Sequence, residues 1–584
     1  MSNPKVHNVR FYKPKPKAVY CMALEPQENK LAISRSDASL EIWNLSNAPF
    51  IERRIASSTE NFSIEGLAWC ETRLFSVGLH GLLVEYDLYK LDVKSRAVVT
   101  GEAAFCLDIN KNKTQIAVGT EQGYLNIFQI TEDEVLFEKF LDKQEGRILC
   151  LKFDHSGEYI VSGSMDAIRI WSVKTNQALF KMIPGRSEQQ KATIVWCLAV
   201  TKDFTIVSGD SRGILTIWDG KVGAQLESYQ SHRADILSLC LSEDENSLYC
   251  AGIDPNILNY VRIKVKDEAY RWVRSIQRKI HEHDVRALVL NGHKLYSSGV
   301  DGYLACSYHP PKTLLKYPPI LQNPCATVCT KSQYILLRYP KFIEIWSLGV
   351  SGGERDKHTG LFAVKSEPKK LVVVQKVVKT DEEERKEGIV CATMSHDGKL
   401  ILYSTRLGVR LLKFVCDEDK PKLIPIEMLD KLGECPCVSA IFTSNHLLII
   451  APNSGGLQVF GFKNDTPFLI QKISAEMEDT ITFLTASATA HYLVAGDVKG
   501  NIFVWTLKNN QYDFHFVAYS NSSIIEFDLK KRELTKFSRS LTKNLPKQWT
   551  LRSSIIRSIT FDPRVDHIII LHDDDSVIVI DKNK

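Results

Sequence analysis

The sequence GDSRG (209–213) has the G-x-S-x-G spacing that presents a catalytic serine, here Ser211, in one large class of hydrolases. That chemistry needs a strand, a sharp turn and then a helix, with an acid and a histidine later in the chain. The residues after Gly213 are ILTIWD, which alternate as a strand does, and an equivalent turn recurs elsewhere in the chain. We therefore interpret Ser211 as a turn residue of a repeat, and keep a hydrolase that uses Ser211 as an alternative.

Two further clusters contain residue types that bind metal ions. His281 and His283 would share one face of a strand, but no third ligand is suggested, and structural zinc sites have four. The run HDDD (572–575) is rich in carboxylate oxygens, which suit a hard cation. It lies, however, where sister repeats have a hairpin turn. We therefore expect a turn-anchoring histidine at 281, a solvated turn at 572–575 and no metal.

The 14 cysteines are scattered, and most lie inside apolar runs. The two close pairs, Cys325 with Cys329 and Cys435 with Cys437, lack the second pair that a zinc or redox centre would need. There is also no phosphate-binding G-x-x-x-x-G-K-[ST] sequence and no convincing dinucleotide motif. We predict buried, reduced thiols, no cofactor, no small-molecule substrate and no enzymatic activity.

The elements around these residues form a repeat. Each unit has a short apolar strand, then a small residue with Gly or Asp, then an alternating strand that ends in an aromatic residue. The best units end at Trp43, Tyr86, Phe128, Trp171 and Trp218, which lie 43, 42, 43 and 47 residues apart. Weaker units end at Tyr260, Tyr308, Trp346, Phe414, Phe460 and Trp505, and a last hairpin spans 567–581. This period is typical of WD-repeat blades, which are four-stranded sheets of a β-propeller.

About twelve or thirteen units are too many for one ring, which typically holds about seven blades. We therefore predict an all-β protein with two tandem WD-repeat β-propellers of about seven blades each. The first would span residues 1–320 and the second 321–584, with the boundary near the proline-rich YPPILQNP (317–324).

Two places break the rhythm of the second half. The residues around 351–388 lengthen one interval, so we expect surface insertions at 351–360 and 379–388, on either side of the strand-like residues 371–378. Between Trp505 and Phe527 only 22 residues separate two aromatic end-points, so a blade is shortened near 506–527. Because no strand follows DKNK (581–584) either, we expect the second propeller to be incomplete.

The overall composition is that of a soluble folded protein, with 44% hydrophobic and 24% charged residues and a formal net charge of +5. The basic N-terminus has no apolar segment typical of a secretory signal, and no stretch approaches the roughly 20 apolar residues of a membrane span. We expect an intracellular protein that is not bound to a membrane.

Two basic stretches combine cations with aromatic residues, a composition that suits phosphate contact and base stacking. The first is FYKPKPK (11–17), and the second, 530–552, contains Phe537 and Trp549. The candidate contact residues for RNA or a partner are Lys13, Lys15, Lys17, Lys530, Lys531, Arg532, Lys536, Arg539, Lys543, Lys547 and Arg552. A solvated loop is the alternative for each stretch.

The order of the units and their residues resemble those of the cirhin family, whose members are nucleolar WD-repeat proteins of the UtpA subcomplex of the small-subunit processome. The likeness is carried by KVHNVRFY, NKLAISRSDASLEIWNL, RILCLKFDHSGEYIVSGSMDAIRIWSV, LYSTRLGVRLLKF and HIIILHDDDSVIVIDK, and it extends over nearly the whole chain. The shortened blade and the end of the chain depart from the family pattern.

This resemblance implies a non-catalytic scaffold in the nucleolus of the nucleus. Its partners would be UtpA-subcomplex WD-repeat and helical proteins, the 5′ external transcribed spacer of pre-rRNA, and the small nucleolar ribonucleoprotein of the processome. Such a protein would support early 18S rRNA maturation and transcription of ribosomal DNA. A cytoplasmic WD-repeat adaptor, such as a substrate receptor for ubiquitin ligation, is the alternative.

Overall fold

The computed structural model describes the chain except for the following residues: 1–4, 9–15, 47–48, 57–62, 187–190, 265–269, 309–312, 320, 322–323, 330, 350, 356–361, 365–367, 376, 380–383, 387, 418–419, 427–435, 445, 464, 474–478, 488–489, 507–514, 521–522, 529–530, 544–548, 550–555, 557, 563–564, 566, 574–575 and 584.

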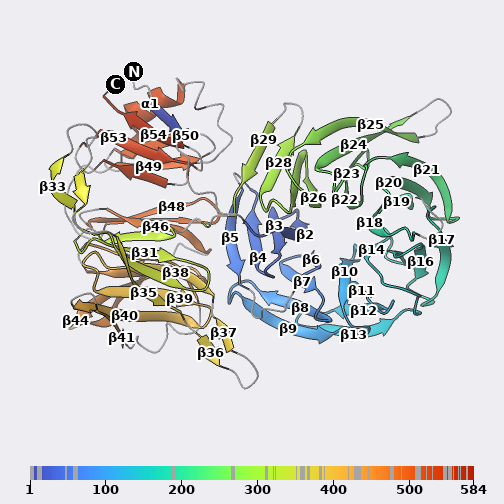
Figure 1. Cartoon of the computed structure of the whole chain (residues 1–584), viewed down its shortest axis with the longest axis horizontal. Helices are drawn as coiled ribbons and strands as arrows, with labels where there is room; N and C mark the ends of the chain where they lie inside the picture. Colours follow the sequence, from blue (N-terminus) through green and yellow to red (C-terminus); the bar gives the residue numbers. More distant parts are fainter. Residues whose placement is uncertain are drawn as a thin grey trace.

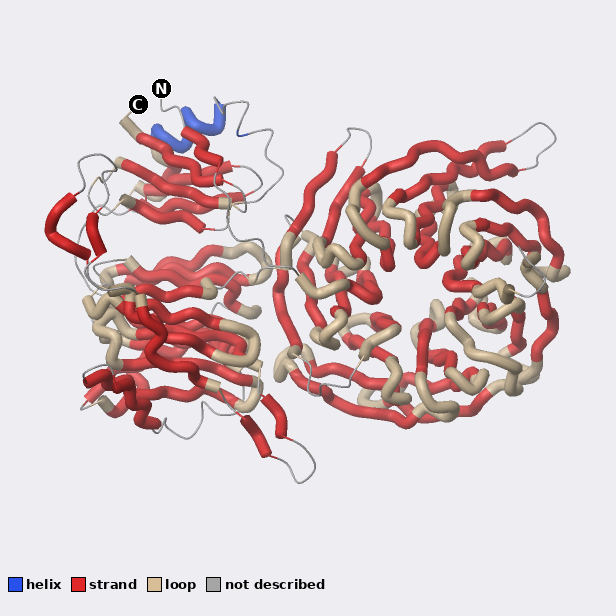
Figure 2. Tube along the Cα trace, viewed as in Figure 1, coloured by secondary structure: helices blue, strands red, loops and turns tan. Residues whose placement is uncertain are grey.

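Seven four-stranded antiparallel sheets, built from β2 to β29, form a ring that is the first propeller (Figures 1 and 2). In each sheet the strands follow sequence order from the centre of the ring to its perimeter. The first three sheets are β2 Val19–Glu25, β3 Lys30–Arg35, β4 Leu40–Asn44 and β5 Phe50–Ile55; β6 Gly66–Cys70, β7 Arg73–Val77, β8 Leu82–Asp87 and β9 Asp92–Val98; and β10 Ala104–Ile109, β11 Gln115–Thr120, β12 Leu125–Ile130 and β13 Val135–Phe140. The next two are β14 Cys150–Phe153, β15 Tyr159–Gly163, β16 Ile168–Ser172 and β17 Ala178–Met182; and β18 Val195–Val200, β19 Thr205–Asp210, β20 Ile214–Asp219 and β21 Ala224–Gln230. The last two are β22 Ile236–Leu241, β23 Ser247–Gly252, β24 Asn256–Lys264 and β25 Tyr270–Lys279; and β26 Val285–Asn291, β27 Lys294–Gly299, β28 Leu304–Tyr308 and β29 Thr313–Tyr317.

The described residues of the second propeller form six larger sheets and a helix, and this propeller is seen from the side in Figure 1. Its four-stranded sheets are β30 Ala326–Cys329, β31 Tyr334–Arg338, β32 Ile343–Ser347 and β35 Lys369–Val374; β38 Ile389–Met394, β39 Leu400–Thr405, β40 Gly408–Asp417 and β41 Lys420–Ile426; and β42 Cys437–Phe442, β43 Leu448–Pro452, β44 Leu457–Lys463 and β45 Thr466–Ile473. Two sheets have three strands: β46 Ile481–Ala486, β47 Tyr492–Asp497 and β48 Ile502–Thr506; and β49 His515–Ser520, β50 Ser523–Asp528 and β51 Glu533–Leu534. The helix is α1 Lys536–Lys543, and the last sheet contains β52 Ser558–Phe561, β53 Ile568–His572 and β54 Ser576–Asp581.

The predicted aromatic end-points up to Trp505 lie on the third strand of their sheets, where two tryptophans reach a small residue on the second strand. Trp171 Nε1 donates to Ser162 Oγ at 2.8 Å, and Trp218 Nε1 donates to Ser208 Oγ at 2.9 Å. The second and third strands are buried on both faces, as expected of sheets packed between neighbouring blades. In contrast, most residues of the outer strand β21 are exposed.

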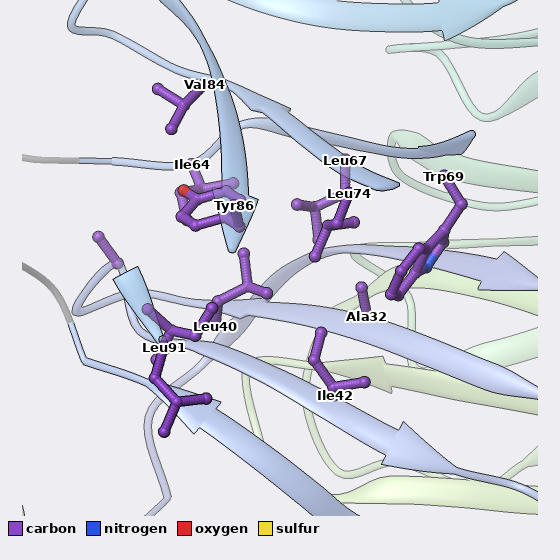
Figure 3. Close-up of a cluster of buried hydrophobic side chains, with 12 residues drawn as sticks. Ala32, Leu40, Ile42, Ile64, Leu67, Trp69, Leu74, Val84, Tyr86 and Leu91 are labelled. Atoms are coloured by element: carbon purple, nitrogen blue, oxygen red, sulfur yellow. The ribbon is translucent and has the colours of Figure 1, made fainter. Parts of the chain in front are cut away.

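The core consists of clusters that join one blade to the next. In Figure 3 side chains of the first blade, such as Leu40 and Ile42, point toward Leu67, Leu74 and Tyr86 of the second. Because each cluster takes residues from two sheets, no blade can bury its apolar faces alone. Neighbouring blades are therefore needed for stability.

The predicted assignment of residue 1 onwards to the first propeller is wrong at the N-terminus. Strand β1 (Lys5–Asn8) pairs antiparallel with β54 and becomes the fourth strand of the last sheet, in the order β1-β54-β53-β52. This pairing covers the edge of β54 that faces away from β53, and unpaired strand edges are unfavourable. The chain therefore begins in the second propeller and crosses to the first before β2.

The two irregular regions also contain strands. Within 351–388, β35 is the fourth strand of its sheet and pairs with β32, which confirms the strand-like character of the residues between the two predicted insertions. On either side of β35 are two small hairpins, β33 (Ser351–Arg355) with β34 (Phe362–Val364) and β36 (Val377–Lys379) with β37 (Glu384–Lys386). Around 506–527 the shortened interval coincides with the two three-stranded sheets.

The two propellers contact each other through the outer strands of the first two blades. Arg53 Nη2 on β5 donates to Thr480 Oγ1 at 2.9 Å, and Asn453 Nδ2 donates to the Leu88 carbonyl at 3.2 Å. Arg406 Nη1 forms an ion pair with Asp92 Oδ1 at 2.8 Å. These polar interactions are combined with apolar packing of Val390 on β38 against the core between the first two blades.

Candidate nucleic-acid interface

Ser211 is part of a hydrogen-bonded turn between β19 and β20. Its Oγ accepts a bond from the Ile194 amide at 3.0 Å, and its own amide donates to the Ile194 carbonyl at 2.9 Å. Gly213 has φ = 75°, a left-handed conformation that glycine adopts easily. Tight β-turns require such a conformation, so the angle favours a turn over a nucleophile elbow. A Cβ at Gly213 would also lie 2.2 Å from the His232 carbonyl oxygen. Ser211 thus connects the turn to the segment before β18.

His281 and His283 do not act together. The ring of His281 is 1% exposed, with Nδ1 2.7 Å from Asp301 Oδ2 and Nε2 2.8 Å from Ser297 Oγ, whereas His283 is exposed. Both ring nitrogens thus have a hydrogen-bond partner, Nδ1 the Asp301 carboxylate and Nε2 the Ser297 hydroxyl. His281 therefore anchors the turn after β27.

His232 holds the corresponding place in the preceding unit, buried beside Cys250 with Nε2 3.5 Å from the thiol sulfur. Burial lowers the pKa of His232, which favours the neutral ring. The two histidines therefore share a structural role.

The acidic run after β53 forms a hairpin turn as far as it is described. Asp573 is buried, and its Oδ1 accepts bonds from the Ser576 amide at 2.7 Å and the Ser576 hydroxyl at 2.8 Å. Asp574 and Asp575 lie outside the described residues. Within the described part of the chain, no group of three or more His, Cys, Asp or Glu side chains could hold a metal ion.

The cysteines are free thiols wherever the structure describes them, and most are buried. Burial raises the pKa of Cys21 and Cys250 to about 12. It also raises the pKa of Cys106, Cys150 and Cys197 well above the ordinary value. Thiols of this kind are poor nucleophiles because the thiolate is scarcely populated. Cys435 lies outside the described residues, so its pairing with Cys437 stays untested.

Of the first basic stretch, Lys13 and Lys15 lie outside the described residues, and Lys17 is exposed. The Lys17 carbonyl accepts a bond from Arg35 Nη1 at 2.7 Å, and the same guanidinium is paired with Glu41. The backbone at Lys17 is thus held against the first blade while its ammonium faces solvent.

The second basic stretch begins with a turn and the helix α1, which lies against β50. Thr535 Oγ1 accepts a bond from the Ser538 amide at 3.2 Å and so caps the helix N-terminus. Ser538 and Leu541 are buried beneath the helix, whereas Lys536 and Arg539 are exposed on its outer face. The helix therefore presents cations to solvent from a fixed backbone.

Two ion pairs offset part of this charge. Arg539 Nη2 pairs with Glu533 Oε2 at 2.8 Å, and Lys531 Nζ lies 3.5 Å from Asp528 Oδ2. Arg532, in the turn before β51, is exposed with φ = 54°. Lys543 lies in the last turn of α1, and Lys530, Lys547 and Arg552 lie outside the described residues.

The prediction that aromatic residues of this stretch stack on bases is wrong for Trp549. Its ring is 1% exposed and packs in a core with Ile524, Leu541 and Ile569 between the last two sheets. Phe537 is partly buried against the same core. An apolar ring this large contributes more by filling the gap beneath α1 than it could in solvent. The described surface of this stretch is therefore basic but not aromatic.

Comparison with known proteins agrees with the fold. The WD domain, G-beta repeat family matches residues 138–172, from the end of β13 to the end of β16. The chain is a tandem WD-repeat β-propeller protein. Among the described residues, no helix has the length and apolar character that crossing a membrane would require.

Three relatives align along most of their length. The chain is 28% identical to the human U3 small nucleolar RNA-associated protein 4 homolog, over 100% of this chain and 89% of the relative. It is 27% identical to U3 small nucleolar RNA-associated protein 4 of Schizosaccharomyces pombe, over 93% of this chain and 82% of the relative. It is 25% identical to the protein of that name in Saccharomyces cerevisiae, over 94% of this chain and 78% of the relative. The likeness therefore includes both propellers.

Proposed function

We propose that this protein is a non-catalytic scaffold of the small-subunit processome in the nucleolus. It would bind the 5′ external transcribed spacer of pre-rRNA together with UtpA-subcomplex WD-repeat and helical proteins, near the U3 small nucleolar ribonucleoprotein. In this position it would support early 18S rRNA maturation and transcription of ribosomal DNA.

The observation that supports this proposal most strongly is the alignment of the whole chain with proteins named for association with U3 small nucleolar RNA. The side chains with catalytic potential are consistent with a scaffold, because Ser211 and His281 are both used in turn-anchoring hydrogen bonds. Propeller perimeters and loops offer extended surfaces rather than a reaction pocket, so affinity would come from many contacts.

The test is affinity purification of the tagged full-length chain after RNA crosslinking in cells. We expect recovery of U3 small nucleolar RNA, spacer RNA and UtpA proteins, with the tagged protein in the nucleolus. Recovery of ubiquitin-ligase subunits from a cytoplasmic protein, without these RNAs, would instead identify an adaptor.

The same experiment tests the basic surface of α1. The variant Lys531→Glu/Arg532→Glu/Lys536→Glu/Arg539→Glu should recover less spacer RNA, because reversed charges repel phosphates, while UtpA proteins still co-purify. The variant Lys420→Glu/Lys422→Glu/Lys463→Glu/Lys472→Glu, with four lysines on the outer part of other blades, makes the same change in net charge and is the control. Equal spacer recovery in both variants would exclude α1 as a contact.

A further inference from the structure

The hairpin formed by β24 and β25 is unusually long for this propeller. Its strands contain nine and ten residues, whereas the outer strands of the other six blades contain five to seven. Pairing continues to Lys264 opposite Tyr270, and Figure 1 shows the two strands running along the perimeter of the ring. The two strands form a ribbon that packs on the blade core through Tyr260 and Trp272 and continues past Trp272 to the pair of Lys264 and Tyr270.

The two strands of the ribbon are strongly basic, and residues 265–269 between them, which lie outside the described residues, contain Lys266, Asp267 and Glu268. The strands themselves contain no Asp or Glu and six cations, which are Arg262, Lys264, Arg271, Arg274, Arg278 and Lys279. Arg262 pairs with Asp203 at 2.9 Å and Arg271 with Glu227 at 3.3 Å. Arg274 and Arg278 donate instead to neutral acceptors, Gln277 Oε1 at 2.7 Å and Ser307 Oγ at 2.9 Å. These neutral contacts orient the guanidinium groups without cancelling their charge.

An aromatic ring is exposed among these cations. Tyr270 is 55% exposed, and the Arg262 guanidinium lies 4.6 Å from the centre of its ring. The register places Lys264 opposite Tyr270, Arg262 opposite Trp272, and Arg274 opposite Tyr260, so these residues share one face of the ribbon.

The ribbon is anchored to the blade at Trp272. Trp272 is buried, and the Tyr229 hydroxyl donates to its carbonyl at 2.9 Å. The cations and Tyr270 are therefore presented from a backbone held by the blade core, which limits the conformational entropy lost on binding.

We propose that the distal half of the β24–β25 ribbon binds single-stranded RNA, an inference that rests on the scaffold function proposed above. Lys264 and Arg274, on the same face as Tyr270, contact phosphates, and the Tyr270 ring stacks on a base. Cations that follow a backbone beside an exposed ring are the combination that suits single-stranded nucleic acid. Alternating charge and ring along a ribbon fits an extended polyanion better than a compact acidic protein surface.

The test measures binding of the full-length chain to a labelled single-stranded oligouridylate over a range of salt concentrations. In the variant Lys264→Gln/Arg274→Gln, loss of two phosphate contacts should lower the slope of log affinity against log salt by about 1.4. The control Lys420→Gln/Lys472→Gln removes the same charge from outer strands of the second propeller and should leave the slope unchanged. Circular dichroism establishes that both variants are folded.

The ring is tested separately. Tyr270→Ala should weaken binding on the order of tenfold, whereas Tyr270→Phe, which keeps the ring, should bind as the wild type does. Wild-type affinity and slope in the double variant would overturn the inference, even if that variant loses binding to an acidic protein partner. If the chain fails to recover U3 RNA from cells but these shifts are observed, the scaffold proposal fails and the RNA-binding ribbon stands. If U3 RNA is recovered and the shifts are absent, the ribbon inference alone fails.

Discussion

At the scale of single residues, polar side chains that could perform chemistry are instead used to hold turns. His281 is buried between a carboxylate and a hydroxyl, and Ser211 Oγ accepts a hydrogen bond from a backbone amide. Such networks stabilise a fold because each buried polar group has a partner, and they become costly when one member is removed.

We predict that His281→Ala lowers the free energy of unfolding of the first propeller by about 2 kcal/mol, because Asp301 and Ser297 lose a buried partner. His283→Ala, two residues away and exposed, should change it by less than about 0.5 kcal/mol. Urea unfolding followed by tryptophan fluorescence measures both. Equal effects of the two substitutions would contradict the anchoring role.

At the scale of elements, thiols on the inner strands connect neighbouring blades. Cys106, Cys150 and Cys197 each direct Sγ toward a backbone carbonyl of the following blade, at 3.5–3.6 Å. The residue opposite Cys197 on β19 is Gly209, where a Cβ would lie 2.7 Å from the sulfur. The small residue before the hairpin turn in the repeat therefore makes room for the thiol.

These thiols predict a loss of stability in alkaline solution. Burial raises their pKa in the folded state, so the folded chain keeps protons that the unfolded chain releases above its pKa of about 9. The stabilisation is complete below about pH 9 and decreases as the pH rises further. Thermal unfolding from pH 8 to pH 11 should show a smaller decrease in Tm for Cys106→Ala/Cys150→Ala/Cys197→Ala than for the wild type. Parallel decreases would rule out the thiols as the cause.

At the scale of the whole molecule, two connections between distant segments hold the propellers. Strand β1 completes the last sheet of the second propeller before the chain builds the first. Arg53 and Asn453 then bridge the two rings, and the Arg53 guanidinium also lies 4.8 Å from the centre of the Tyr89 ring. The contacts of Arg53 and Asn453 thus contribute to the relative position of the rings together with apolar packing of Val390.

We predict that Arg53→Ala loosens the rings, because Thr480 loses its donor and Tyr89 its cation. Small-angle X-ray scattering should show a larger radius of gyration, and calorimetry should separate the unfolding of the two rings. The control is Arg54→Ala, on the opposite face of β5 beside Asp37 of the first propeller. An unchanged scattering profile for Arg53→Ala would show that the contact does not hold the rings.

The sequence by itself determined the repeat, the strands that end in Trp171 and Trp218, the tandem propellers and the turn around Ser211. All of these depend on the alternation of apolar residues, on turn residues and on the repeat period. These patterns can be recognised in the sequence without knowledge of contacts between distant segments. Only the tertiary structure decided that β1 pairs with β54, that Trp549 fills a core, that Arg53 reaches Thr480 and that Tyr270 stands exposed among cations. The physical reason is that the local sequence around a strand edge, an aromatic ring or a cation is the same whether that group contacts solvent or a distant segment. Its partner is selected by packing of the whole chain.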